Sequence, residues 1–242
     1  MNTRVAFFWV GSDISIPTLL VQSIRLVGGS EFEIVQLTDL TTPVVPEVSR
    51  VSRHALSESI MVARLQAYSY LEPSKHFTYF CDADSIFINT PHVDSDSDIL
   101  LCPRVENFRI NPRYPEHYPE FEGKMIDEVM PFMFGAIVIR GKNNIFTGLL
   151  KKCLKLPPRY HRWFGDQIAL AKAVGAGNFN YSLLNPYRYL NIVSRVPTKQ
   201  EMHQLIGEQV QMLTFKGPTI EKLTSSMGAF QALRSIRMGG KE

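Results

Sequence analysis

Short apolar runs alternate along this chain with segments whose apolar residues recur at helical spacing. Residues 5–10 (VAFFWV) are continuously apolar up to a turn signal that begins at Gly11, as a strand buried on both faces requires. Between Ile16 and Val27 the apolar residues then recur every three or four positions. The chain therefore opens as strand, loop and helix, and this rhythm constrains its fold more than any other feature.

The same alternation continues toward the end of the chain. Further strands are predicted at 32–37, 77–81, 85–88, 99–102, 134–139 and 210–215, and further helices at 57–71, 145–156 and 166–174. Alternating strands and helices predict an α/β fold with a mostly parallel central sheet and helices on both faces. Residues 103–131 are rich in proline, which excludes long regular elements and indicates a functional loop.

Size and composition indicate one soluble domain, residues 1–242. The 242 residues, 45% of them hydrophobic, suffice for a large core. The three cysteines are far apart, which argues against a zinc knuckle or a disulfide framework and favours a cytoplasmic setting. No apolar run approaches the roughly 18 residues of a membrane span. A net charge of +3 is too small to predict a nucleic-acid partner.

Two aspartates, Asp82 and Asp84, directly follow the predicted strand 77–81. Side chains two residues apart on extended backbone point the same way, so both carboxylates would face the crevice at the carboxyl end of the sheet. Like charges in such a place require protonation, hydrogen bonds or a cation. Oxygen ligands with open coordination positions suit Mg²⁺ or Mn²⁺ shared with a diphosphate, so the pair predicts a divalent-metal site.

The run at residues 94–98 repeats the Asp-x-Asp spacing and acts as an internal control. Its aspartates lie among serines with no apolar strand before them, as in a solvated loop. The metal prediction therefore depends on the strand that precedes Asp82 and not on the spacing alone. The six histidines are scattered, so no histidine-based zinc site is predicted.

Four segments extend this pattern. Residues 63–91 combine a helix carrying Arg64, an apolar strand, Asp-x-Asp and a second apolar run; FMFGAIVIRG (132–141), WFGDQIALAKAV (163–174) and LTFKGPTIEK (213–222) follow. In this order they resemble the GT-A glycosyltransferases, in particular the family numbered eight, which includes glycogenin and bacterial galactosyltransferase-like enzymes. The resemblance spans most of the chain and implies a GT-A fold, a UDP-sugar donor and a Mn²⁺ or Mg²⁺ cofactor.

The resemblance also implies roles for individual residues. Asp82 and Asp84 would hold the metal, and Asp166 and Gln167 would face the transferred sugar as catalytic residues. The residues implied in binding the nucleotide and its diphosphate are Val10, Gly11, Asp13, Asp39, Arg64, Lys216, Gly217 and Lys222.

Two departures from the family pattern stand beside these assignments. Met133 replaces an asparagine, and Thr214 replaces the histidine that completes the metal shell, although water or a hydroxyl can serve Mg²⁺ instead. Each implied residue also has a structural alternative. Arg64 fits a salt-bridged helix residue, Asp166 fits a helix cap, and the two lysines fit ordinary surface side chains, of which one is expected to contact phosphate.

The predicted function is transfer of a hexose from a UDP-sugar to a glycan or lipid-linked acceptor, with retention of configuration implied by the resemblance. Residues 103–131 would form the acceptor side. A nucleotidyltransferase is one alternative, but residues 11–15 lack its glycine-rich basic loop. The other alternative is a binding module without activity, motivated by Met133 and Thr214.

The C-terminal tail, residues 219–242, is predicted to be helical and weakly basic. Such a helix suits peripheral contact with the inner face of a membrane, where a lipid-linked acceptor would lie. A terminal helix that packs on the domain and exposes its basic residues is the simpler alternative.

Overall fold

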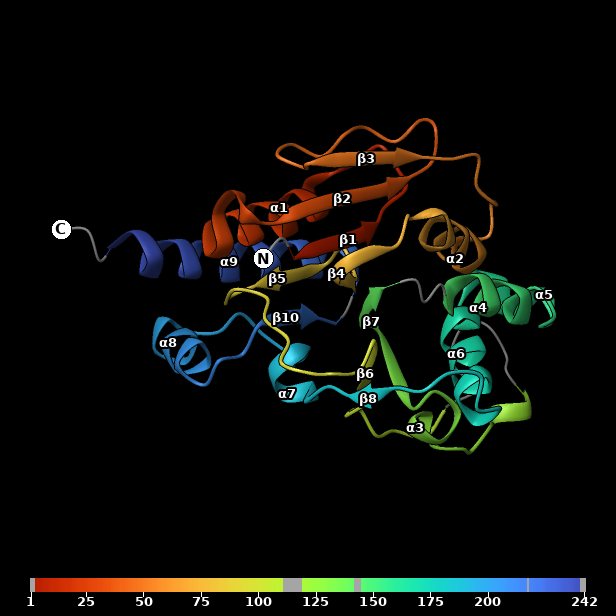
Figure 1. The fold of residues 1–242 in the computed structure, drawn as a ribbon. Helices are drawn as coiled ribbons and strands as arrows, with labels where there is room; N and C mark the ends of the chain where they lie inside the picture. The colour runs from red at the N-terminus through yellow and green to blue at the C-terminus, as the bar shows by residue number, and fades with distance from the viewer. Residues whose placement is uncertain (1–2, 111–118, 142–144, 217, 240–242) are drawn as a thin grey trace.

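A seven-stranded sheet forms the centre of the computed structural model, which describes residues 3–110, 119–141, 145–216 and 218–239 (Figure 1). The strand order is β3-β2-β1-β4-β7-β6-β8. The strands are β1 (Arg4–Phe8), β2 (Glu33–Thr38), β3 (Arg50–Arg53), β4 (Ser74–Cys81), β6 (Ile99–Pro103), β7 (Phe132–Gly141) and β8 (Ser182–Leu183). Strands β1 to β4 are parallel, and β7 runs antiparallel to both of its neighbours.

A smaller sheet of three strands lies beside the central one. Its order is β5-β10-β9, with β5 (Ser85–Phe87), β9 (Asn191–Val193) and β10 (Met212–Phe215). The chain therefore leaves β4 in one sheet and enters β5 in the other within three residues, 82–84. The two apolar runs predicted on either side of Asp82 and Asp84 are both strands, but they belong to different sheets.

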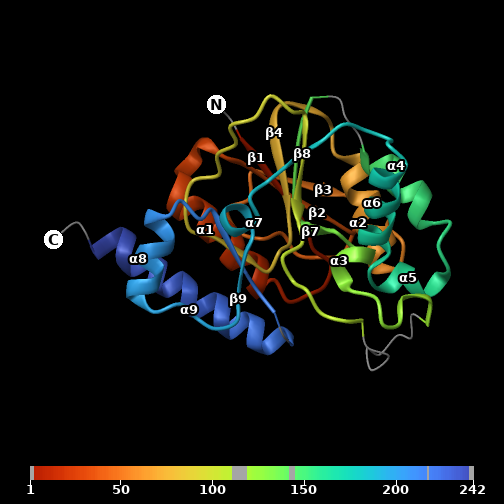
Figure 2. The ribbon, with the colours of Figure 1, turned by 90° about the horizontal axis from the view of Figure 1, so that it is seen from below.

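Helices cover both faces of the central sheet (Figure 2). Helices α2, α4, α5 and α6 lie on one side of it, and α1 and α9 lie on the other. The α-helices are α1 (Ser15–Gly28), α2 (Ile60–Tyr70), α3 (Ile126–Val129), α4 (Ile145–Cys153), α5 (Pro158–Arg162), α6 (Gly165–Gly175), α7 (Pro186–Tyr189), α8 (Lys199–Gly207) and α9 (Thr219–Met238); short 3₁₀ helices occupy Gly29–Glu31 and Pro119–Phe121. The predicted α/β fold with a mostly parallel sheet is confirmed.

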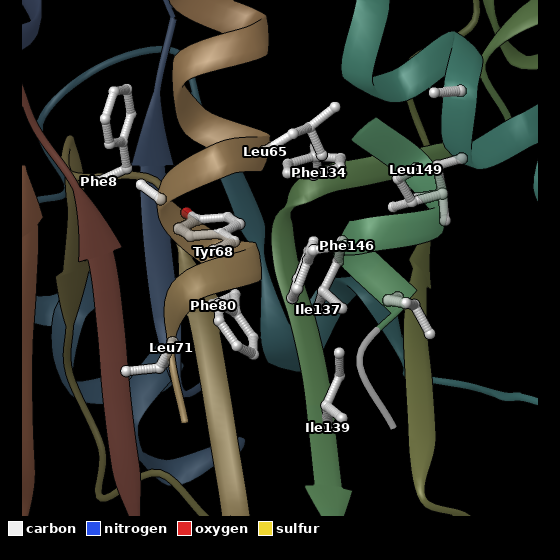
Figure 3. Packing of buried hydrophobic residues seen from close by; sticks show 14 of the residues in the cluster. Phe8, Leu65, Tyr68, Leu71, Phe80, Phe134, Ile137, Ile139, Phe146 and Leu149 are labelled. Atoms are coloured by element: carbon white, nitrogen blue, oxygen red, sulfur yellow. The ribbon is translucent and has the colours of Figure 1, made fainter. Parts of the chain in front are cut away.

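The buried side chains explain the continuous apolar runs. In β1, Phe8 faces the core shared with α2, α4 and α6, and Phe7 faces the core shared with α1. On the first side, Tyr68 of α2 and Phe146 of α4 meet with ring centroids 4.9 Å apart, and Phe80 of β4 lies 4.5 Å from Phe146 (Figure 3). A strand covered on both faces needs apolar residues at every position, as the sequence has.

The strand order reverses at β1. The chain passes from β1 to β2 and β3 on one side, and α2 then returns it to β4 on the other side of β1. Because β1 and β4 are parallel neighbours, with Phe7 paired to Cys81, their carboxyl ends lie together. Ligands of open α/β sheets bind outside the carboxyl ends of the strands at such a reversal, and Asp82 directly follows β4 at this edge.

Several elements were not predicted from the sequence. Strand β3 lies at the sheet edge in a segment expected to be a loop, and its half-exposed residues give no apolar pattern. Residues 103–131 include short helices, and their buried Ile126 and Met130 pack with Tyr160 in a small cluster of their own. Residues 111–118 of the predicted acceptor-side loop lie outside the described residues.

The helix predicted in the tail is present as α9 and is docked on the domain. Its Ala229 and Leu233 are buried in a cluster with β5 and β10. Arg237, one of the basic residues of the tail, donates to the carbonyl oxygen of Ile88 at 2.9 Å. Among the described helices, none combines the length and the apolar character of a membrane span.

The aromatic cluster allows a test of the fold. Phe146 is 2% exposed, so replacing it by alanine leaves a cavity in the core, and we expect Phe146→Ala to lower the free energy of unfolding by about 3–5 kcal/mol. Leu40 is 64% exposed, and Leu40→Ala is the matched control, with an expected change within about 0.5 kcal/mol. Urea denaturation of both variants measures the difference, and equal losses would contradict this packing.

Candidate functional site

A buried arginine joins carboxylates from two other segments at the carboxyl end of β4. Arg64 of α2 donates through Nη1 to Asp82 Oδ1 at 2.8 Å and through Nε to Asp166 Oδ2 at 2.7 Å, and its Nη2 also contacts Asp166. The guanidinium lies over the ring of Phe134, 4.5 Å from its centroid. Arg64 therefore holds α2, the turn after β4 and the start of α6 in one arrangement.

The electrostatics of this group follow from burial. The side chain of Arg64 is 14% exposed and that of Asp166 is fully buried. Burial alone would lower the pKa of Arg64, but attraction to Asp166 and Asp82 raises it above its ordinary value. Burial raises the pKa of Asp166, and Arg64 opposes this rise. Each charge is thus tolerated inside the protein because the other is present.

Glycine is required beside Asp82. A Cβ atom at Gly135 of β7 would lie 2.5 Å from Asp82 Oδ2, which is closer than real Cβ atoms approach any heavy atom. The antiparallel pairing of β4 with β7 brings these residues together, since Cys81 pairs with Ala136. The absence of a side chain at Gly135 leaves room for the Asp82 carboxylate beside β7.

The start of α6 has an unusual backbone. Phe164, its N-cap residue, has a φ of 63°, in the left-handed region that non-glycine residues seldom adopt. A Cβ at the next residue, Gly165, would lie 2.2 Å from the carbonyl oxygen of Tyr160. This tight connection places Asp166 inside the protein, where its Oδ1 accepts the N–H of Gln167 at 2.7 Å. Phe164, and not Asp166, is therefore the N-cap, although Asp166 does bind a free N–H of the first turn.

A second arginine, which the sequence analysis missed, orients Gln167. Arg104 donates through Nη2 to Gln167 Oε1, through Nη1 to Glu106 Oε2 at 2.6 Å, and through Nε to the Met130 carbonyl oxygen at 2.7 Å. Because the amide oxygen of Gln167 is occupied by Arg104, its NH₂ group is the part left to donate elsewhere. Arg104 directly follows β6, whose carboxyl end lies at the same edge of the sheet as that of β4. This position after a predicted strand could have identified Arg104 as a site residue from the sequence.

The two predicted lysines have different partners. Lys222, in the first turn of α9, lies with its Nζ 2.5 Å from Asp84 Oδ2. Lys216 is 3.8 Å from Glu106 and half exposed. Burial and repulsion from Asp82 raise the pKa of Asp84, whereas Lys222 opposes the rise. Gly217, the third predicted residue of this segment, lies outside the described residues.

Both aspartates keep an oxygen that no described residue binds. Asp84 Oδ1 is buried without a hydrogen-bond partner among the described residues, and none of them donates to Asp82 Oδ2. Asp82 is also 37% exposed, so its carboxylate can be reached from solvent. Two carboxylates with one unoccupied oxygen each fit a hard divalent cation that completes its shell with water and phosphate. Within the described parts of the chain, no cluster of three or more His, Cys, Asp or Glu side chains forms a closed metal site.

The residues predicted to bind the nucleoside lie at the ends of β1 and β2. Gly11 has a φ of 129°, and no atom lies within 4 Å of the position that its Cβ would take. Its N–H donates to the hydroxyl of Thr42 at 2.9 Å, and Asp39 accepts the N–H of Thr42 at 2.7 Å. Asp13 accepts the N–H of Ser15 at 2.9 Å. Val10 packs against the core that contains Arg64's helix.

These short hydrogen bonds account for the acidity of the loop aspartates. The hydrogen bond from Thr42 holds the pKa of Asp39 below its ordinary value, and that from Ser15 does the same for Asp13. No hydrogen bond or ion pair between described residues joins this loop group to Asp82 or Asp166. The two groups share the carboxyl edge of the sheet because β1 lies beside β4.

Thr214 lies next to the turn that carries the aspartates. It pairs with Ser85 across β10 and β5 and is 4% exposed. Met133 of β7 is also buried, in a cluster that includes Cys81 and Ala83 on either side of Asp82.

Comparison with known families gives no further assignment. No family model matches this chain, and a search of curated proteins found no significant match. The function has therefore to be inferred from the geometry and chemistry of the site.

The ion pair of Arg64 and Asp166 gives a prediction with a defined pH dependence. Arg64→Met leaves Asp166 buried without a cation, which we expect to cost about 3–5 kcal/mol of stability at neutral pH. In this variant the pKa of Asp166 is higher in the folded protein than in the unfolded chain. The variant is therefore most stable below the unfolded pKa, and it loses stability as pH rises through the folded pKa. Urea denaturation should therefore show a difference in the free energy of unfolding between Arg64→Met and the original protein that increases from acidic to neutral pH.

Two further variants isolate the effect. Adding Asp166→Asn to Arg64→Met should remove most of the pH dependence, because the titrating group is gone. Arg140 forms an ion pair with Asp98 at 3.1 Å on the surface, and Arg140→Met should cost no more than about 1 kcal/mol. A loss for Arg64→Met that does not change with pH would show that Asp166 is not the group left unpaired.

Proposed function

We propose that this protein is a metal-dependent glycosyltransferase of the GT-A type, which transfers a hexose from a UDP-sugar to a glycan or lipid-linked acceptor. The observation that carries the proposal is the position of Arg64, Asp82 and Asp166 at the carboxyl end of β4, where the strand order reverses. Ligands bind at this point in open α/β sheets. The GT-A fold itself is part of the proposal, and the order of the strands and the second sheet support it.

In the proposed site, Asp82 and Asp84 hold Mn²⁺ or Mg²⁺ through the two oxygens that no described residue occupies. A divalent ion held by these two aspartates would supply charge neutralisation for the leaving diphosphate. Lys222 and Lys216 approach the same phosphates from the late segment. The loops at Gly11 and Asp39 hold the uracil and the ribose, and the open space at Gly11 lets backbone approach the nucleotide closely.

The sugar is held by the start of α6. Gln167, with its oxygen bound by Arg104, donates to a sugar hydroxyl through its NH₂ group, and the buried Asp166, fixed by Arg64, positions Gln167 through its backbone N–H. In the reaction the bond between the anomeric carbon and the diphosphate oxygen breaks and a bond to the acceptor hydroxyl oxygen forms, which releases UDP and a proton. Fixed donors and acceptors of this kind stabilise the transition state because they need no reorganisation.

The first experiment tests nucleotide, metal and aspartates together. We expect UDP to bind the protein in calorimetric titration with Mn²⁺ and not with EDTA, and Asp82→Asn/Asp84→Asn to weaken this binding by roughly a hundredfold or more. The matched control is Asp94→Asn/Asp96→Asn, which alters an Asp-x-Asp on the exposed serine-rich loop and should leave binding unchanged. Metal-dependent binding that survives in the first variant, or no UDP binding at all, contradicts the proposal.

Metal-dependent binding without turnover has a different meaning. It would favour a nucleotide-binding protein that lacks transferase activity, provided that a broad panel of donors and acceptors gives neither transfer nor hydrolysis of the sugar nucleotide. Release of UDP in the presence of donor and metal alone would already exclude that alternative.

The contact between Lys222 and Asp84 gives a second prediction. Lys222 lies where it competes with a divalent ion for Asp84 and also where it can bind phosphate. We therefore expect Lys222→Met to raise the affinity for Mn²⁺ alone and to lower the affinity for UDP with Mn²⁺, each by roughly five- to a hundredfold. Lys216→Met, whose lysine contacts Glu106 instead, should leave the affinity for Mn²⁺ alone unchanged.

Titration of Mn²⁺ by electron paramagnetic resonance measures the first affinity, and calorimetry measures the second. If Lys222→Met changes the affinity for Mn²⁺ alone and the affinity for UDP with Mn²⁺ in the same direction, Lys222 supports the site only through the packing of α9.

A further inference from the structure

A strongly basic segment forms the surface of α4, α5 and the turn between them. Residues 151–163 contain Lys151, Lys152, Lys155, Arg159 and Arg162, and no Asp or Glu occurs between Glu128 and Asp166. These five charges exceed the net charge of +3 of the whole chain, so the remaining residues sum to −2. Residues 151–163 thus carry more positive charge than the net charge of the whole chain, and we call them the basic α4–α5 surface.

Most of these side chains face solvent. Lys151, Lys155, Arg159 and Arg162 are exposed, and Lys152 is half-buried. Arg159 pairs with Glu120 at 2.6 Å. Among the described residues, no carboxylate forms an ion pair with the other four, so their charge is not neutralised within this part of the protein.

Two large apolar side chains lie among the charges. Leu154 is 53% exposed and Trp163 is 51% exposed. Trp163 meets the ring of Phe164 edge-on, with centroids 5.7 Å apart, and keeps about half of its surface in solvent. Exposed tryptophan and leucine beside lysine and arginine are the combination that binds at the interface of an anionic bilayer.

We propose that the basic α4–α5 surface docks on a membrane that contains anionic lipids, with the cationic side chains at the head groups and Trp163 and Leu154 inserted at the acyl boundary. The charge of this segment supports an anionic partner, because only Arg159 of its five basic residues forms an ion pair with a described carboxylate. A nucleic acid would satisfy the charges but would offer no apolar medium to Leu154. The inference does not rest on the proposed transferase activity.

This surface is distinct from the C-terminal tail. The end of α9 and the pair α4–α5 lie on opposite sides of the central sheet in both views (Figures 1 and 2). Arg237 of the tail is engaged with the carbonyl oxygen of Ile88. The proposed membrane contact is therefore separate from the one that the tail sequence suggested.

Vesicle co-sedimentation tests the inference. The intact protein should bind vesicles of phosphatidylcholine and phosphatidylglycerol, mixed in roughly a 2:1 ratio, and not vesicles of phosphatidylcholine alone. Each basic residue near an anionic surface contributes roughly fivefold, so Lys151→Gln/Lys155→Gln/Arg162→Gln should weaken partitioning by roughly a hundredfold.

The matched control removes the same charge from other faces. Lys75→Gln/Lys199→Gln/Arg234→Gln alters three exposed residues, one of them in the tail, and should change partitioning only a few-fold. Equal urea midpoints for both triple variants establish that each is folded. Equal loss of binding in the two variants, absence of binding to the anionic vesicles, or stronger binding to double-stranded DNA than to vesicles at the same salt overturns the proposal.

Tryptophan fluorescence provides a second, independent measurement. The chain has two tryptophans, and Trp9 donates through Nε1 to the carbonyl oxygen of Asp13 within the protein. Adding anionic vesicles should shift the emission to shorter wavelength, and Trp163→Phe should abolish this shift. A shift that persists in Trp163→Phe shows that Trp163 does not enter the membrane interface and overturns that part of the proposal.

Discussion

The site depends on one buried guanidinium. Arg64 lies on a helix that otherwise packs through apolar side chains, and it is buried only because Asp166 and Asp82 accept its hydrogen bonds and Phe134 covers its face. The three elements that supply these partners are separated in sequence by up to about a hundred residues. Since an unpaired charge inside a protein costs several kcal/mol, this group also fixes how α2, β4 and α6 meet. The same interaction thus serves the packing of the fold and the position of the proposed sugar-binding residues.

Charge balance at the carboxyl edge explains why a cation fits there. Three carboxylates, Asp82, Asp84 and Asp166, lie against two basic side chains, Arg64 and Lys222, so the group carries excess negative charge. Displacing Arg64 would leave the buried Asp166 without an ion-pair partner. Lys222 differs, because it extends from the first turn of α9 and is 29% exposed. Of the two internal cations, only Lys222 can yield its place beside the aspartates to a metal ion and a phosphate.

The sequence predicted the parts of this site that follow buried strands. The apolar run of β4 ending at Asp82 and Asp84 marked the carboxyl edge, and the spacing of α2 placed Arg64 on a helix nearby. The contacts of Arg64 with two carboxylates could not be derived from spacing, because they join residues brought together only by the strand order. Arg104 was missed for a related reason, since it lies in a proline-rich stretch whose short elements have no periodic pattern. Strand β3 escaped prediction because an edge strand with half-exposed residues lacks an apolar run.

The tight start of α6 connects the two surfaces to which we assign function. Trp163 and Phe164 lead from the basic α4–α5 surface directly into Gly165 and Asp166, and the left-handed conformation of Phe164 makes the change of direction between them. Gly165 is needed there because any side chain would strike the backbone at Tyr160. A residue held in the left-handed region costs of order 1–3 kcal/mol and persists only where its surroundings enforce it. Directly after this turn, Arg64 and the N–H of Gln167 hold the buried carboxylate of Asp166, so the strained residue lies next to a firmly fixed one.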